Sequence, residues 1–195
     1  EAAYQASLKT FDELCGFIAA VGFDRMMTVM FTSYDTPKDE MRKIALDRAR
    51  AMGEIMARHK LRIGIENLGP LHFRTQFKYP FHYSVPDTVA FCKDAGPNWG
   101  LCLDAWHWHH AGGTVNDILD AGKQRIVVVH LDDARQQPPE EVRDSQRLLP
   151  GEGVVNLSGF LGAVKKIGYE GQVGPEPLSR FPLNTTPDEV ARKTL

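Results

Sequence analysis

Four apolar segments of this sequence each end in a side chain that could bind a metal ion. The segments are LRIGIEN (61–67), WGLCLDA (99–105), RIVVVHLDD (125–133) and GQVGPEP (171–177), and the candidate ligands are Glu66, Asp104, His130 and Glu176. Three carboxylates and one imidazole suit Mn²⁺, Co²⁺, Mg²⁺ or Zn²⁺ and leave coordination positions free for neighbouring oxygens of a substrate. Each carboxylate taken alone could equally cap a helix or form an ion pair, so the metal prediction depends on all four side chains converging.

The segment LCLDAWHWHHAGG (101–113) is unusually rich in imidazoles and indoles. The rings that follow Asp104 are Trp106, His107, Trp108, His109 and His110. His107 could contact a substrate or be an ordinary packed histidine. The two later histidines are predicted to face solvent in a loop, because the ligand set is complete without them. Trp106 is predicted to form core or a wall of the site, with stacking on a sugar ring as the functional alternative.

Strands and helices that alternate along the chain would position these side chains. The predicted strands are the four segments above and RMMTVMF (25–31), and the predicted helices are 4–21, 36–60, 84–96, 114–122, 157–168 and the start of one at 186–195. Continuous apolar strands separated by helices indicate a parallel sheet, either doubly wound or closed as a (β/α)8 barrel. Both architectures gather catalytic groups at the carboxyl ends of their strands.

Composition limits the classes of function. The 195 residues are 43% hydrophobic, which is enough for a core, and we expect a single domain over residues 1–195. The formal net charge is -2 with no long basic run, so nucleic acid is not an expected partner. No apolar stretch approaches the roughly 18 residues that span a bilayer, so no membrane partner is expected. The three cysteines form no CxxC pair, and buried reduced thiols in a cytoplasmic protein are the simplest interpretation.

Several of these segments together resemble a known family. IGIENLGP, GLCLDAWHWHHAGGT, VVVHLDDA and LLPGEGVVNLSGFLGAVKKIGYEGQVGPEP are similar to successive strand-end motifs of the xylose isomerase-like TIM-barrel superfamily, in its sugar phosphate isomerase/epimerase branch. The resemblance runs from about residue 4 to the end of the chain. The segments 104–107 and 147–177 most resemble the inosose isomerase-like members. The expected fold class is therefore α/β, a (β/α)8 TIM barrel.

The resemblance implies roles for particular residues. It implies that one divalent metal ion is held by Glu66, Asp104, His130 and Glu176. Glu66 and Glu176 would also be the catalytic acid and base. His107 would contact substrate oxygen, and the arginine that usually follows the metal-binding histidine would be Arg135, the nearest candidate.

Three further features have two interpretations each. Glu152 in the PGEG segment could contact substrate or Arg147, or it could simply belong to a turn rich in proline and glycine. Asp132 could orient His130 as a partner outside the ligand set, or be a solvated loop acid. The aromatic and basic segment HFRTQFKYPFHY (72–83) could be a lid or an interface loop.

The chain departs from the family in its number of repeats. A complete barrel has eight βα units in about 250 residues. This sequence supplies about five, starting at what resembles the helix before the fourth strand and stopping within the last helix. An isolated five-stranded piece would expose two sheet edges, so we expect the chain to be part of a larger protein, incomplete at its N-terminus.

The expected function is isomerisation or epimerisation of a sugar, sugar phosphate or inosose through an enediolate. The alternative is dehydration by an enzyme resembling 3-dehydroshikimate or inosose dehydratases. An endonuclease IV-like DNA-repair enzyme is disfavoured, because the Asp-x-His pair it needs is missing where Asp144 precedes Ser145 and Gln146. A non-catalytic scaffold is disfavoured by the complete ligand set. The expected partners are a small polyhydroxylated ketone or sugar and further copies of the chain.

Overall fold

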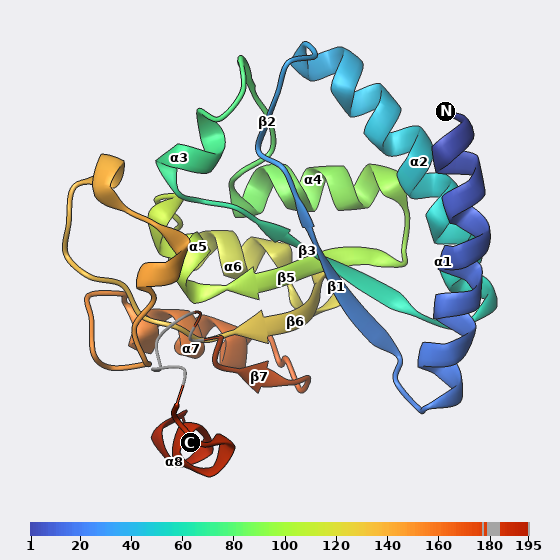
Figure 1. Cartoon of the computed structure of the whole chain (residues 1–195). Helices are drawn as coiled ribbons and strands as arrows, with labels where there is room; N and C mark the ends of the chain where they lie inside the picture. The colour runs from blue at the N-terminus through green and yellow to red at the C-terminus, as the bar shows by residue number, and fades with distance from the viewer. Residues whose placement is uncertain (177, 179–183, 195) are drawn as a thin grey trace.

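The computed structural model describes residues 1–176, 178 and 184–194, and its centre is a five-stranded parallel sheet (Figure 1). The strands, in their order across the sheet, are β1 (Arg25–Met30), β3 (Arg62–Asn67), β5 (Trp99–Asp104), β6 (Ile126–His130) and β7 (Val173–Gly174). Every neighbouring pair is parallel. The order in space therefore follows the order along the chain, as it does in a barrel.

Each pair of neighbouring strands is connected through at least one helix. The longer helices are α1 (Ala2–Ala20), α2 (Lys38–Arg58), α4 (Val85–Ala95), α6 (Val115–Ala121), α7 (Leu157–Lys166) and α8 (Pro187–Thr194). Side chains at the start of several helices accept backbone hydrogen bonds: Ser84 before α4, Thr114 before α6 and Asn156 before α7. These caps satisfy amide groups that the helices cannot pair internally, and they fix where each crossover turns back toward the sheet.

Short elements decorate the carboxyl ends of the strands. They are α3 (Leu71–Arg74), α5 (Ala105–His110), the 3-10 helices η2 (Pro139–Glu141) and η3 (Asp144–Gln146), and an antiparallel pair of β2 (Ser33–Tyr34) with β4 (Tyr79–Pro80). A further 3-10 helix, η1 (Lys123–Arg125), precedes the amino end of β6. The segment 72–83 thus contains most of α3 and the whole of β4. The prediction of a loop at residues 109–110 is wrong. Asp104 caps the helix α5, which includes both residues and ends at His110.

The two central strands, β3 and β5, are buried along almost their whole length. All six residues of β5 are buried. Gly64 on β3 faces Gly100 on β5, and a Cβ atom at Gly64 would approach the backbone nitrogen of Cys102 to 2.7 Å. Glycine therefore lets β3 and β5 approach closely at the middle of the sheet.

The core has two clusters that share the sheet. One joins α1, α2 and α4 to β3 and includes Met56, Ile63 and Phe91, whereas the other joins α5, α6 and α7 to β5 and β6 and includes Trp106 and Phe160. The three cysteines are buried and free, as expected. Among the helices that the structure describes, none combines the length and apolarity that a bilayer crossing requires.

The edges of the sheet show that the barrel is partial. Within the described residues β1 and β7 each pair on one side only, and Met27, Val29 and Phe31 at the β1 edge are exposed. The last predicted strand, 171–177, is reduced to two residues, because Pro175 has no N–H group to continue the ladder. The expected α/β fold with about five βα units is confirmed.

Candidate metal centre

The four predicted ligands converge at the carboxyl ends of the strands. Single ligand atoms of Glu66, Asp104, His130 and Glu176 all lie within 4.8 Å of one another. His130 is at the centre, with its Nδ1 3.2 Å from Glu66, 3.7 Å from Asp104 and 3.4 Å from Glu176. A cation between these atoms would reach all four, so the donor set fits a divalent metal ion.

Asp104 is fixed by its place at the junction of β5 and α5. Its Oδ1 accepts the backbone N–H of His107 at 2.7 Å, which makes Asp104 the N-cap of α5. Its Oδ2 is thereby turned toward His130 and toward the guanidinium of Arg147, 2.7 Å away. One carboxylate therefore starts a helix with one oxygen and offers the other to the candidate centre.

Arg147 completes the arrangement as a buried cation. Its Nη1 donates to Asp104, to Asp132 at 3.0 Å and to Glu176 at 2.9 Å. Asp144 lies 2.9 Å from its Nη2, and the side chain of Arg147 is only 1% exposed. We call Glu66, Asp104, His130, Glu176 and Arg147 the strand-end cluster. In it, Arg147 neutralises carboxylates that would otherwise repel one another.

The charges in the strand-end cluster shift the pKa values of its members. Burial alone would raise the pKa of Asp104, but its hydrogen bond with His130 and the charge of Arg147 hold it below its usual range. The hydrogen bond with His130 lowers the pKa of Glu176. Burial would lower the pKa of His130, yet its carboxylate partners raise it above the ordinary value. The imidazole therefore carries a proton that a metal ion would have to displace.

Asp132 lies next to the strand-end cluster and links it to the loop that carries Glu176. Its Oδ1 accepts the backbone N–H of Glu176 at 2.9 Å and its Oδ2 accepts from Arg147. Burial, assisted by the charge of Asp104, raises the pKa of Asp132 to about 6. Of its two interpretations, the structure favours a supporting partner, although its contacts orient Glu176 and Arg147 and not His130.

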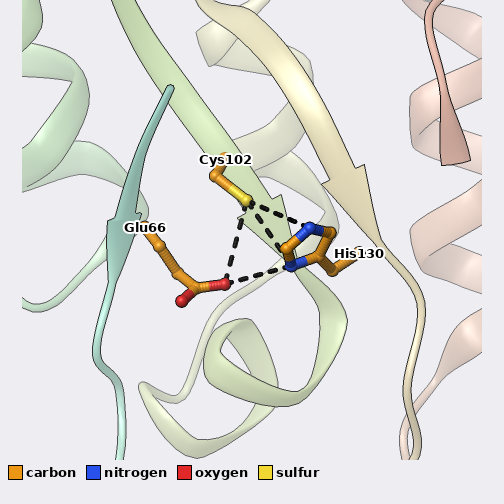
Figure 2. A group of neighbouring side chains, drawn as sticks. All are labelled: Glu66, Cys102 and His130. Atoms are coloured by element: carbon orange, nitrogen blue, oxygen red, sulfur yellow. Dashed lines mark hydrogen bonds and ion pairs between the residues drawn. The ribbon is translucent and has the colours of Figure 1, made fainter. Parts of the chain in front are cut away.

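A thiol lies directly beside the oxygen and nitrogen donors. Figure 2 shows the side chains of Glu66, Cys102 and His130 directed toward one another from three neighbouring strands. The Cys102 sulfur is 3.8 Å from Glu66 Oε1 and 3.7 Å from His130 Nδ1. Burial raises the pKa of Cys102 to about 12, so this group is a neutral thiol. The sequence indicated no sulfur at the centre, because Cys102 reads as part of an apolar strand.

His107 is buried against the strand-end cluster. Its Nε2 is 3.0 Å from Arg147 Nη2 and 3.8 Å from Glu66 Oε2, while its Nδ1 is 3.3 Å from the backbone nitrogen of Gly69. A Cβ atom at Gly69 would collide with the carbonyl oxygen of His107, so this approach requires glycine. Trp106 is 1% exposed and belongs to the core, with Arg147 stacked 5.0 Å from its ring.

Two predicted substrate residues lie apart from the strand-end cluster. Arg135 is exposed in the loop after β6, and Glu152 is exposed in the next turn, where its carboxylate accepts the backbone N–H of Leu149 at 3.2 Å. The buried arginine is instead Arg147, which the sequence suggested only as a partner of Glu152. The available signal was the excess of strand-end carboxylates, which requires a buried cation nearby.

Comparison with known proteins places the chain in a family. The profile of the family described as "Xylose isomerase-like TIM barrel" matches residues 1–194. The chain belongs to this family. A solved xylose isomerase domain protein from Alicyclobacillus acidocaldarius superimposes with a TM-score of 0.88 at 30% identity, covering 100% of this chain and 69% of that one. The solved IOLI protein, which has a zinc atom bound, superimposes with a TM-score of 0.82 at 22% identity, and the match covers 68% of that protein's chain. At this identity the match supports the fold alone.

Curated relatives match this chain over part of their own length. The inosose isomerase of Bacillus subtilis is 28% identical over 147 residues, which are 75% of this chain and 51% of that protein. The 3-dehydroshikimate dehydratase of Pseudomonas putida is 27% identical over 159 residues, 80% of this chain and 24% of that protein. The chain therefore spans about half the length of the first of these relatives.

Proposed function

We propose that this chain carries the metal centre of a divalent-metal-dependent isomerase or epimerase acting on a sugar, a sugar phosphate or an inosose. The single observation that supports the proposal is the convergence of ligand atoms from Glu66, Asp104, His130 and Glu176 within 4.8 Å. The relationship to inosose isomerases suggests a polyhydroxylated ketone as the substrate class. Mn²⁺, Co²⁺, Mg²⁺ and Zn²⁺ all suit this oxygen and nitrogen donor set.

Proton transfer is the chemistry that the residues support. A divalent ion, when bound, would polarise a carbonyl group of the substrate and the hydroxyl on the adjacent carbon. This would acidify the proton on the carbon that carries the hydroxyl. Glu176, whose side chain is 32% exposed, is accessible to a substrate, whereas Glu66 is 5% exposed and lies deeper. In the proposal one carboxylate removes the α-proton to give the enediolate of the substrate, and the other returns a proton to the neighbouring carbon or the opposite face.

Two further groups could support the two glutamates during this exchange. His107 and Arg147 lie against Glu66 and Glu176 respectively, and the side chains of both are at most 1% exposed. The ring nitrogens of His107 meet Gly69 and Arg147, and Arg147 already donates to carboxylates. In the proposal these two groups therefore hold the glutamates in position beside the substrate and do not contact it themselves.

A dehydratase is the second candidate function. The similarity to the Pseudomonas putida 3-dehydroshikimate dehydratase favours it. The same proton abstraction would lead to loss of water if the substrate carried a hydroxyl on the carbon next to the enediolate. The two candidates share the first step and differ in the fate of that hydroxyl.

Metal analysis combined with solvent exchange tests the proposal. We expect the purified chain to bind one divalent ion, and Glu66→Gln and Glu176→Gln to weaken that binding, measured by calorimetry. With ketoses and inososes in D₂O, we expect deuterium at the carbon next to the carbonyl, and loss of the exchange in Glu176→Gln. Exchange accompanied by release of water would favour the dehydratase. Failure of the four-ligand chain to bind any divalent ion would overturn both candidates.

A further inference from the structure

A polar cavity lies between α3, α5 and the loop that follows β6, apart from the strand-end cluster. Its volume is about 240 Å³, and none of the four candidate metal ligands lines it. The polar side chains around it include Arg74, His109, His110, Arg135 and Gln136. The proposed function uses none of them, so the cavity needs an explanation of its own.

The charge of this cavity is entirely positive. Two arginines and two histidines line it, and no aspartate or glutamate does. Other cavities on the molecule have acidic side chains in their lining. Asp39 and Asp47 line one of them, and Asp117 and Asp120 line another. A wall that contains cations and no acidic side chain concentrates negatively charged ligands.

Both arginines have unused hydrogen-bonding capacity. Arg135 makes no hydrogen bond or ion pair with the described residues. The Arg74 guanidinium stacks over Tyr83 at 4.6 Å, and its Nε is buried without a partner. A buried donor on a cation is costly unless an acceptor completes it. An anion in the cavity would supply that acceptor to Arg74 and to Arg135.

The two histidines supply donors that bring little charge of their own. His109 and His110 are half-buried at the end of α5. Burial lowers the pKa of both, to about 4 for His110, so both rings are neutral at pH 7. Each neutral ring offers one N–H group. The guanidinium groups therefore provide the attraction, and the imidazoles and Gln136 can add directional hydrogen bonds.

We propose that this cavity binds a small tetrahedral oxyanion, either free phosphate or the phosphoryl group of a larger ligand. Arginine guanidinium groups match phosphate oxygens with paired, charge-assisted N–H donors. The site is separate from the strand-end cluster and does not depend on the proposed metal chemistry. Loss of isomerase activity would therefore leave this proposal standing, and loss of anion binding would leave the proposed function standing.

Calorimetric titration with inorganic phosphate tests the site. The chain is first treated with EDTA, so that phosphate cannot bind through a metal ion, and is held at low ionic strength. Arg135→Glu should weaken phosphate binding about tenfold, because it reverses a charge at the cavity wall. Arg192→Glu is the matched control, because this substitution makes the same change in net charge. Arg192 is exposed on α8 and does not line the cavity. The control should change the affinity less than about twofold.

A second variant and a second ligand sharpen the outcome. Arg74→Met keeps an unbranched stem against Tyr83 and removes the buried Nε, and we expect it also to weaken phosphate binding about tenfold. Glycerol phosphate that binds more tightly than phosphate would identify the phosphoryl group of a larger ligand, whereas equal affinities would identify the free anion. The proposal is overturned if phosphate does not bind, or if Arg135→Glu and Arg192→Glu weaken it equally.

Discussion

The strand-end cluster and the segment 70–83 both contain buried polar side-chain atoms, but these atoms are paired to different extents. Every member of the strand-end cluster has a hydrogen-bond or ion-pair partner within the protein. We call residues 70–83, together with Thr32 and Asn67, the loop layer. The backbone carbonyl of Thr32 accepts the N–H of Phe81, and the side-chain amide of Asn67 donates to the carbonyl of Tyr83.

Among the described residues, the buried side-chain nitrogen and oxygen atoms without a partner all belong to the loop layer. The buried side-chain atoms without a partner are Thr32 Oγ1, Asn67 Oδ1, His72 Nδ1, Arg74 Nε and both ring nitrogens of His82. A fully paired network holds its members in one arrangement, whereas unpaired buried groups lower stability until water or a ligand meets them. The strand-end cluster is thus held in place before any ligand binds, and the loop layer retains polar groups that are free to pair.

Removal of the central cation should have the largest effect. Arg147→Met keeps a long side chain but leaves Asp104, Asp132 and Glu176 without their counter-charge. We expect it to lower the free energy of unfolding of the metal-free chain by about 3–5 kcal/mol, measured by urea denaturation. Arg135→Met is the control, because Arg135 is exposed, and should change stability by less than about 0.5 kcal/mol. Equal effects of the two variants would show that the carboxylates do not depend on Arg147.

The unpaired His82 predicts a loss of stability at acid pH. Burial lowers its pKa in the folded chain to about 4, below the value near 6.5 of an unfolded histidine. Between these values the unfolded chain binds a proton that the folded chain does not, so stability is complete above pH 6.5 and falls as the pH is lowered. The contribution lost by pH 4 is about 3 kcal/mol.

Substitution of His82 separates its share from that of other buried histidines. His82→Phe should flatten the dependence of the unfolding free energy on pH between 6.5 and 4, because phenylalanine does not bind a proton. The new ring should fit this site, since Phe81 and Phe91 already pack against the His82 ring. His110 also has a pKa lowered to about 4 and should preserve part of the slope. A variant that leaves the whole slope unchanged would show that His82 binds its proton in the folded state.

Two adjacent aspartates offer a smaller and more selective test of the strand-end cluster. Asp132→Asn would place an amide against Arg147 Nη1, and we expect about 10–100-fold weaker metal binding by calorimetry. Asp133 instead accepts backbone N–H groups of Gly151, Gly153 and Val155. Asp133→Asn should therefore lower stability by about 2 kcal/mol while leaving the metal affinity unchanged. The reverse pattern would contradict the role of Asp132 as a supporting partner of the strand-end cluster.

The sequence predicted the strand ends well because they obey a simple periodic rule. Apolar strands that alternate with helices must align their carboxyl ends, and this brought Glu66, Asp104 and His130 into one candidate centre. The loops follow no such period. Arg135 and Arg147 lie on the same irregular loop, and their positions depend on turns such as η2 and η3 that long-range contacts select. The helix at 105–110 was missed because a run of aromatic rings hides the cap that Asp104 provides.

Glu152 lies outside both regions and should have the smallest effect. Its carboxylate accepts a backbone hydrogen bond within its own turn, and glutamine retains an oxygen that can do the same. We expect Glu152→Gln to change the free energy of unfolding by less than about 0.5 kcal/mol and the rate of α-proton exchange by less than about twofold. The sequence left open a contact between Glu152 and substrate. A tenfold slower exchange in this variant with unchanged stability would restore that contact and extend the active region to this turn.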